Sequence, residues 1–183
     1  VTGGSSGIGR AIAIAAARAG ADVAITWKSN EAGANAVAAD IRATGRRAVI
    51  VRADVGEPEG LEQLRDFLRD ALGGIDAWIN NAGADILTGQ GATLSRREKL
   101  DLLLRVDLRG TMLASWAAVE MMRAQPQGGV IINMSWDHVI RGLAGDNPEL
   151  FSAVKGGILG FSKSLARSVA PPIRVNVLGP GWI

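Results

Sequence analysis

The first ten residues hold the pattern with the clearest chemical implication. Gly3, Gly7 and Gly9 stand in the spacing G-x-x-x-G-x-G, with Ser5 and Ser6 between them, and an apolar stretch of helical periodicity follows. A glycine-rich turn lets the backbone approach a ligand closely, and the helix that it opens directs free N–H groups and a positive dipole end toward that ligand. The pattern predicts a phosphate or pyrophosphate site. The alternative is a loop that only turns the chain.

The segment after the next apolar stretch bears on which ligand this site binds. Residues 21–27 are apolar and β-rich, and they run into Lys28 and Ser29 without an acidic side chain. In dinucleotide sites an acidic residue at this place binds the ribose 2′-hydroxyl, whereas a basic one binds a 2′-phosphate. Lys28, together with Arg10 just after the last glycine, favours NADP(H) over NAD(H) as the cofactor. The competing interpretation is that Lys28 is an ordinary solvated loop lysine.

Two further polar turns follow strand-like segments. Asp54 and Val55 offer a carboxylate and a backbone N–H that suit an adenine, although an Asp at this place is also a common helix cap. The later turn, residues 80–83, reads NNAG. Its small residues let a nicotinamide ribose lie against the backbone, and we expect the amide of Asn80 or Asn81 to stabilise the turn.

These turns need a scaffold that brings them together, and strands alternate with helices along the whole chain. Besides the residues before the glycines, we expect strands at 21–27, 47–53, 75–80, 128–134 and 173–178, and helices at 7–19, 30–44, 58–72, 96–124 and 151–169, the second helix being capped by Ser29 or Asn30. The alternation predicts an α/β fold. It is a doubly wound parallel sheet of about six strands with helices on both faces, in three layers. Ligands bind at the carboxyl ends of such strands, where every polar turn above falls.

Composition limits the classes of function. With 183 residues, 48% of them hydrophobic, the chain is long enough for one domain with a substantial core. It has no Cys and one His, so we expect no disulfide and no metal site. The net charge of +2 is dispersed, which argues against nucleic acid as a partner, and no apolar stretch is long enough for a membrane span. We expect a cytoplasmic protein.

Five motifs in this order resemble the short-chain dehydrogenase/reductase family. They are TGGSSGIG at 2–9, DV at 54–55, NNAG at 80–83, Lys155 near the start of a helix, and RVNVLGPGWI at 174–183. The chain is most similar to the bacterial glucose dehydrogenase and 3-oxoacyl-carrier-protein reductase branches of that family. The resemblance covers the whole chain. It implies a Rossmann-type fold, a bound NAD(P)(H), hydride transfer between a nicotinamide and a carbonyl or alcohol, and a homodimer or homotetramer.

The resemblance also implies which residues contact the nucleotide. Carried over residue by residue, these are Gly3, Ser6, Gly7, Ile8, Gly9, Asp54, Val55, Asn81, Ala82, Gly83, Lys155, Pro180, Gly181 and Ile183. Ser5, Arg10, Lys28 and Ser29 join them because of their residue types and places. We expect residues 1–183 to form a single dinucleotide-binding domain that lacks the start of its first strand and the C-terminal lid over the substrate.

The catalytic positions depart from the family's pattern of Asn, Ser and Tyr-x-x-x-Lys. The chain contains no Tyr, and the segment FSAVK places Phe151 four residues before Lys155. Trp136 stands at the usual Ser, with Ser135 one residue earlier and expected to point to the other side, and Asp107 replaces the Asn.

Reduction of a carbonyl leaves an alkoxide that needs a proton, and Phe cannot give one. Ser135, Asp137 and His138 are the substitutes near the site, and His138 is favoured because imidazole titrates near neutral pH. A loop histidine without a role is the alternative, and Trp136 either lines a substrate pocket or covers the end of the sheet. The predicted catalytic set is Lys155, His138, Ser135 and Asp107.

The sequence therefore predicts an NAD(P)-dependent oxidoreductase that acts on a small carbonyl or alcohol substrate through an atypical active site. A second hypothesis is a nucleotide-binding relative without turnover, which acts as a binding or assembly module. We expect the helices at 96–124 and 151–169 to form a subunit interface, because each carries more apolar and small residues than one buried face needs.

Overall fold

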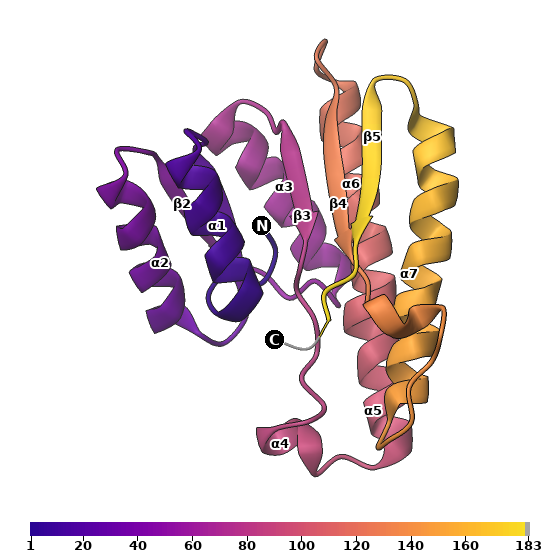
Figure 1. Ribbon diagram of the computed structural model, residues 1–183. Coiled ribbons are helices and arrows are strands. Elements are labelled where there is room, and N and C mark those ends of the chain that lie inside the picture. Colours follow the sequence, from indigo (N-terminus) through magenta and orange to yellow (C-terminus); the bar gives the residue numbers. More distant parts are fainter. Residues whose placement is uncertain (182–183) are drawn as a thin grey trace.

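A computed structural model describes residues 1–181, in which strands and helices alternate as expected (Figure 1). The strands are β1 (Val23–Trp27), β2 (Ala48–Arg52), β3 (Ala77–Asn80), β4 (Gly129–Met134) and β5 (Ile173–Leu178). The helices are α1 (Gly7–Arg18), α2 (Glu31–Ala43), α3 (Pro58–Leu72), α4 (Gly89–Ala92), α5 (Arg96–Leu103), α6 (Gly110–Arg123) and α7 (Pro148–Val169), with a π-helical turn η1 (Leu104–Arg109) and a 3₁₀ turn η2 (Asp137–Val139).

All strand pairs in the described residues are parallel, and they fall into two groups. β1 pairs with β2, and β4 lies between β3 and β5. Residues 1–4 join the groups through hydrogen bonds: Thr2 N donates to the Ile79 carbonyl at 2.9 Å, and Gly4 N donates to the Thr26 carbonyl at 2.9 Å. The expected count of about six strands is therefore corrected to five strands with residues 1–4 between β1 and β3.

At their amino ends, β1 and β3 are separated by a cavity of about 350 Å³ that Val1, Leu64 and Trp78 help to line. Residues 1–4 thus connect the two groups of strands near the carboxyl ends. The glycine turn that follows them lies on that carboxyl edge.

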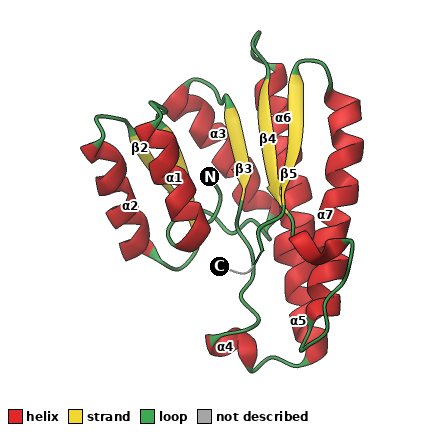
Figure 2. Cartoon of the chain, in the orientation of Figure 1, coloured by secondary structure: helices red, strands yellow, loops and turns green. Residues whose placement is uncertain are grey.

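Helices cover both faces of the strands, as the three-layer prediction requires (Figure 2). Alternate residues of a strand point to opposite faces. Val23 and Ile25 of β1 pack with α1 and α2, whereas Ala24 packs in the larger core with α3 and α6. That larger core continues under β3 and β4 and includes the end of α7.

The structure corrects the helix bounds expected at 96–124 and 151–169, and it decides between the two caps expected for α2. The helix expected at 96–124 is interrupted by the wider turn η1, and the loop before it contains α4. The cap of α2 is Asn30 and not Ser29, because the Asn30 side chain accepts a hydrogen bond from Gly33 N at 2.9 Å. Helix α7 begins at Pro148 instead of Phe151, since proline suits the first helical turn. In residues 1–181, no helix combines the length and the apolar character needed to cross a bilayer.

Candidate active site at the carboxyl edge of the strands

The turns at the carboxyl ends of β1, β2 and β3 surround one cavity of about 840 Å³. Twelve of the residues expected to contact a nucleotide line it: Gly3, Ser5, Ser6, Ile8, Gly9, Lys28, Ser29, Asp54, Val55, Asn81, Ala82 and Gly83. The polar turns identified in the sequence therefore meet in space, because strands that run parallel bring their carboxyl ends to the same edge.

Other expected contacts lie elsewhere. Arg10 points away to α2, where its guanidinium pairs with Asp40 at 3.0 Å, and both side chains are exposed. Pro180 and Gly181 follow β5 and lie beside Asp137, whose N–H donates to the Pro180 carbonyl at 3.4 Å. Ile183 is outside the described residues.

The glycine turn is packed too tightly for side chains at three of its positions, one of which is Gly4, where a Cβ would lie 2.6 Å from the Ile25 side chain. Gly3 has a φ of +64°, and a Cβ there would lie 2.9 Å from Cα of Ala82. A Cβ on Gly9 would lie 2.3 Å from the Gly3 carbonyl oxygen. Asn81 holds this arrangement, because its Nδ2 donates to the carbonyls of Thr2 and Gly3 at 3.0 and 3.2 Å. Of the two amides expected to stabilise the NNAG turn, it is that of Asn81 that holds this turn to the glycine turn.

The start of α1 is open to an anion. Ser6 occupies the N-cap with an extended backbone, yet its side chain makes no capping hydrogen bond, and the first turn contains no acidic residue. Gly7 has a φ of +52°, and nothing lies within 4 Å of where its Cβ would be. The N–H groups of this turn are thus left for a ligand, as a phosphate site requires.

Asn80 has a structural role that the sequence did not reveal. Its Oδ1 accepts a hydrogen bond from Trp78 Nε1 at 2.7 Å, and its Nδ2 donates to Ser115 Oγ at 2.9 Å and to Asn133 Oδ1 at 2.8 Å. All these contacts are buried. A satisfied buried network of this kind fixes β3 against β4 and α6.

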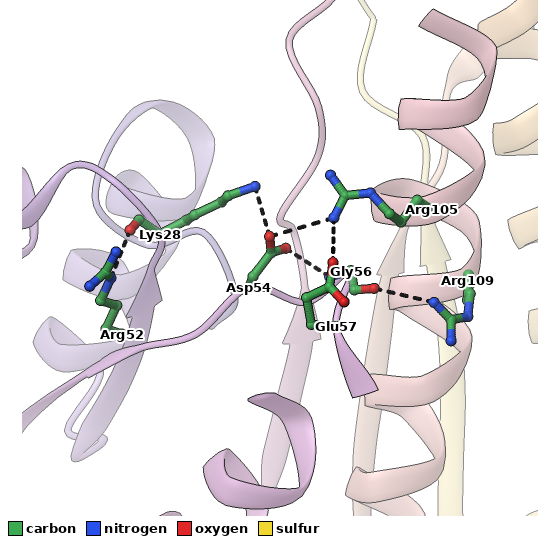
Figure 3. A network of polar contacts seen from close by, with 7 residues as sticks. All are labelled: Lys28, Arg52, Asp54, Gly56, Glu57, Arg105 and Arg109. Carbon is green, nitrogen blue, oxygen red and sulfur yellow. Dashed lines mark hydrogen bonds and ion pairs between the residues drawn. The ribbon is translucent and has the colours of Figure 1, made fainter. Parts of the chain in front are cut away.

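Lys28 and Asp54 form an ion pair at the mouth of the cavity, with 2.7 Å between Lys28 Nζ and Asp54 Oδ2 (Figure 3). Burial acts to raise the pKa of Asp54, but the hydrogen bonds from Lys28 and Gly56 N and the nearby positive charges outweigh it and lower that pKa. Arg105 of η1 also approaches Asp54, at 3.6 Å. Sequence reasoning missed Arg105, since nothing in its neighbourhood along the chain points to the nucleotide turn.

One wall of the cavity was not anticipated. Its residues come from the segment after β3 and from α5 and η1: Ala84, Asp85, Gln90, Gly91, Leu94, Leu102 and Val106. The i, i+4 spacing of Leu102 and Val106 places them on one side of the helix. This apolar pair was the signal in the sequence from which the wall could have been predicted. The wall extends the cavity from the turn after β3 toward α5.

Lys155 and Asp107 form a buried ion pair at the other side of this edge. Lys155 Nζ lies 2.9 Å from Asp107 Oδ2, and the two side chains are 14% and 2% exposed. The second oxygen of Asp107 accepts a hydrogen bond from Ala84 N at 2.8 Å. Asp107 therefore connects Lys155 directly to the cavity wall.

Ser135 follows β4 and faces helix α7. It is buried, and its hydroxyl donates to the Lys155 carbonyl at 2.8 Å, while Lys155 Nζ donates to the Met134 carbonyl at 3.4 Å. The expectation that Ser135 points to the other side agrees with this geometry. Its hydroxyl ties the start of α7 to the end of β4 and so positions Lys155.

Three rings gather beyond β4. The ring centroid of Trp136 lies 5.0 Å from that of His138 and 6.2 Å from that of Phe151. His138 Nε2 is 3.6 Å from an oxygen of Asp137. The candidate proton donor His138 and the phenyl ring of Phe151 therefore both lie beside the indole of Trp136, in one cluster.

Known proteins resemble this chain along almost its whole length. A family profile described as enoyl-(acyl carrier protein) reductase matches residues 3–183. A 3-oxoacyl-[acyl-carrier-protein] reductase from Synechocystis is 34% identical over the whole chain and 72% of its own length. The human protein of the same name is 36% identical over the whole chain and 74% of its length.

The chain belongs to the short-chain dehydrogenase/reductase family.

Solved structures of the short-chain dehydrogenase/reductase family superpose closely on this chain. A short chain dehydrogenase from Burkholderia cenocepacia in complex with NADP is 37% identical, with a TM-score of 0.88 over 99% of this chain and 72% of that one. A short-chain type dehydrogenase/reductase from Mycobacterium marinum is 30% identical, with a TM-score of 0.90 over 100% of this chain and 71% of that one. The predicted Rossmann-type fold is confirmed, and the relatives of this chain are oxidoreductases.

Proposed function

We propose that this protein transfers hydride between NADP(H) and a small carbonyl or alcohol substrate. The observation that carries the proposal is the single cavity of about 840 Å³, which runs from the glycine turn and Lys28 to Gly83 and Ala84. Asp107 binds both the Ala84 N–H and Lys155, so the lysine that the family resemblance assigns to the site lies beside the same cavity. The proposal adds a substrate class and a cofactor preference to the family membership.

The residues present fit a phosphorylated dinucleotide. The uncapped start of α1 suits the pyrophosphate, and Lys28, whose own loop after β1 carries no acidic residue, suits a 2′-phosphate once it leaves Asp54. In this proposal Asp54 and Val55 hold the adenine, and residues 81–83 with Lys155 hold the nicotinamide ribose. The Burkholderia relative, whose structure contains NADP, supports the same preference. When bound, the nicotinamide supplies or accepts the hydride.

Proton transfer must use groups other than a tyrosine. In the direction of reduction, an alkoxide forms and takes a proton, which His138 donates in this proposal as a general acid. Lys155 holds a positive charge at the site, Asp107 orients it, and Ser135 fixes the start of α7. Trp136 and Phe151 give the substrate an apolar surface beside His138.

A second function has its own supporting observation. Lys155 is paired directly with a buried carboxylate, and position 151 carries no hydroxyl, so the nearest ring cannot exchange a proton. These features favour a relative that binds the nucleotide without turning over a substrate. Nucleotide affinity is the same under both functions, whereas turnover is not.

The deciding experiment combines binding with turnover. NADPH and NADH are titrated side by side, and the protein is then incubated with a panel of ketones and alcohols while nicotinamide absorbance is followed. Tighter binding of NADPH and oxidation of it by at least one ketone support the proposal. Binding without turnover across the panel supports the second function, and the absence of binding by either nucleotide overturns both.

The same proposal includes a homo-oligomer built through α6 and α7. Trp116 on α6 is 50% exposed and meets Phe161 of α7 edge to face, with ring centroids 6.2 Å apart. Leu104 at the start of η1 adds another exposed apolar side chain. Light scattering at micromolar concentration should report a dimer or tetramer, and a monomer would end this part of the proposal.

A further inference from the structure

Asp54 lies between two cations that approach from opposite sides (Figure 3). Lys28 comes from the loop after β1, and its Nζ is 2.7 Å from Asp54 Oδ2. Arg105 comes from η1, and its Nη1 is 3.6 Å from the same oxygen. The other carboxylate oxygen accepts a hydrogen bond from Gly56 N at 2.9 Å. Three separate parts of the chain therefore converge on one carboxylate.

The two partners of this ion pair differ in how much they depend on it. The side chain of Asp54 is 22% exposed, whereas that of Lys28 is 59% exposed. Water can replace Asp54 as the partner of Lys28, but it cannot fully replace Lys28 as the partner of Asp54, since a partly buried charge is costly without a counter-charge. Withdrawing Lys28 from Asp54 is thus costly unless another cation remains.

Arg105 is that remaining cation, and it is fixed without a ligand. Its Nη1 is 2.8 Å from Glu57 Oε1, and the side chain lies over Gly56, where a Cβ would come within 3.0 Å of Nη1. A larger residue at position 56 would displace it. Arg109, one turn further on, donates to the Gly56 carbonyl at 3.3 Å and makes no contact with Asp54 among the described hydrogen bonds and ion pairs.

We infer that Arg105 is a specificity-determining residue, because it stabilises Asp54 when Lys28 turns from that carboxylate to the 2′-phosphate of the nucleotide. A nucleotide without the 2′-phosphate leaves the Lys28–Asp54 pair intact and makes no use of Arg105. Arg105 also reduces the repulsion between the Asp54 carboxylate and the phosphate. The inference rests on the proposed function, which supplies the phosphorylated nucleotide as the ligand.

The test uses probes that differ only in the relevant group. Dissociation constants of 2′,5′-ADP and 5′-AMP, and of NADPH and NADH, are measured for the unmodified protein and for Arg105→Ala. We expect Arg105→Ala to weaken 2′,5′-ADP and NADPH about tenfold, which corresponds to about 1.4 kcal/mol. Binding of 5′-AMP and NADH should stay within about twofold. Arg105→Lys should recover most of the loss, because it keeps the charge.

Two further variants separate this role from a general effect. Arg109→Ala removes a neighbouring cation of the same turn that does not reach Asp54, and it should leave the ratio of NADPH to NADH affinity unchanged. In an Asp54→Asn background the carboxylate charge is gone, so Arg105→Ala should no longer alter that ratio. Unfolding midpoints of all variants establish that each is folded under the conditions of the titrations.

The outcomes distinguish this inference from the function on which it rests. Equal weakening of phosphorylated and unphosphorylated probes by Arg105→Ala overturns the inference, as does an unchanged affinity ratio or an effect that persists with Asn at position 54. If the unmodified protein binds none of the four probes, the proposed nucleotide site itself is wrong.

Discussion

The two ends of the candidate site, the cavity and the ion pair of Asp107 and Lys155 beside it, are built by different means. At the nucleotide end, the glycine turn follows the hydrogen-bonded residues 1–4, and Lys28 and Asp54 lie in the turns after β1 and β2. At the reaction end, Asp107 and Lys155 come from different helices and meet through their side chains. An exposed side chain such as Lys28 can be replaced at little cost to the fold, whereas removing one partner of the buried ion pair is costly. We therefore expect nucleotide binding and the proposed turnover to respond separately to changes at the two ends.

The largest expected effect comes from breaking the buried pair at the reaction end. Lys155→Met leaves Asp107, which is 2% exposed, without its counter-charge. We expect a loss of about 3–5 kcal/mol in the free energy of unfolding, measured by urea denaturation. The exposed pair of Arg96 and Glu149, 75% and 48% exposed, is the matched control. Arg96→Met should cost less than about 1 kcal/mol. Equal costs for the two variants would contradict this account of the site.

At the nucleotide end, Lys28→Asp reverses the charge offered to a ribose 2′-phosphate. We expect NADPH affinity to fall by about 1–3 kcal/mol, the scale of a hydrogen bond to a charged group. NADH should bind as well as before or better, and the loss for NADPH should shrink at high salt because exposed charges are screened. Fluorescence titrations at two salt concentrations measure both. If the unmodified protein binds NADH at least as tightly as NADPH, the cofactor assignment is wrong.

A third change acts on turnover and leaves binding intact. His138→Ala removes the proposed general acid, and we expect at least an about tenfold lower rate of carbonyl reduction, within the range typical of general acid catalysis. Asp137→Asn is the companion variant, measured in the same assay. A rate untouched by His138→Ala would move the proton path to water held by Asp107 or Asp137.

The smallest expected effect is that of restoring one hydroxyl. Phe151→Tyr alone should change the rate little, because the indole of Trp136 still occupies the place next to it. Combined with Trp136→Ser, it should raise turnover by more than the sum of the single changes, since two hydroxyls then hold one substrate oxygen. Steady-state rates for the four proteins complete the cycle. Strict additivity would show that the two positions do not share a substrate.

The sequence brought twelve candidate nucleotide contacts to one cavity because its signals there are local. The glycine turn, the lysine after a strand and the NNAG turn can each be identified from a few consecutive residues. Residues from all three segments line the cavity. Arg105 carries no such signal, because its partner Glu57 is 48 residues away along the chain. The sequence likewise did not predict that Asp107 and Lys155 form an ion pair, although it identified each of them as a candidate catalytic residue.

The scaffold was predictable for the same reason, apart from its irregular parts. Strand and helix periodicity located every strand of the described chain to within two residues. A single π-helical turn inside an α-helix leaves the apolar stretch unbroken in the sequence, so η1 was included in one long predicted helix. The sixth strand expected from the sequence corresponds to residues 1–4. They hydrogen-bond to β1 and β3 on their two sides, but the segment is too short to count as a strand.

That π-helical turn has a further consequence for how the molecule evolves. Arg105 and Asp107 lie two positions apart on η1, yet one reaches Asp54 and the other reaches Lys155. A single inserted or deleted residue here would rotate both side chains out of place together. We therefore expect a change in the length of η1 to disturb the contacts of Asp54 and of Lys155 in one step, whereas a substitution at position 105 or 107 disturbs only one of them.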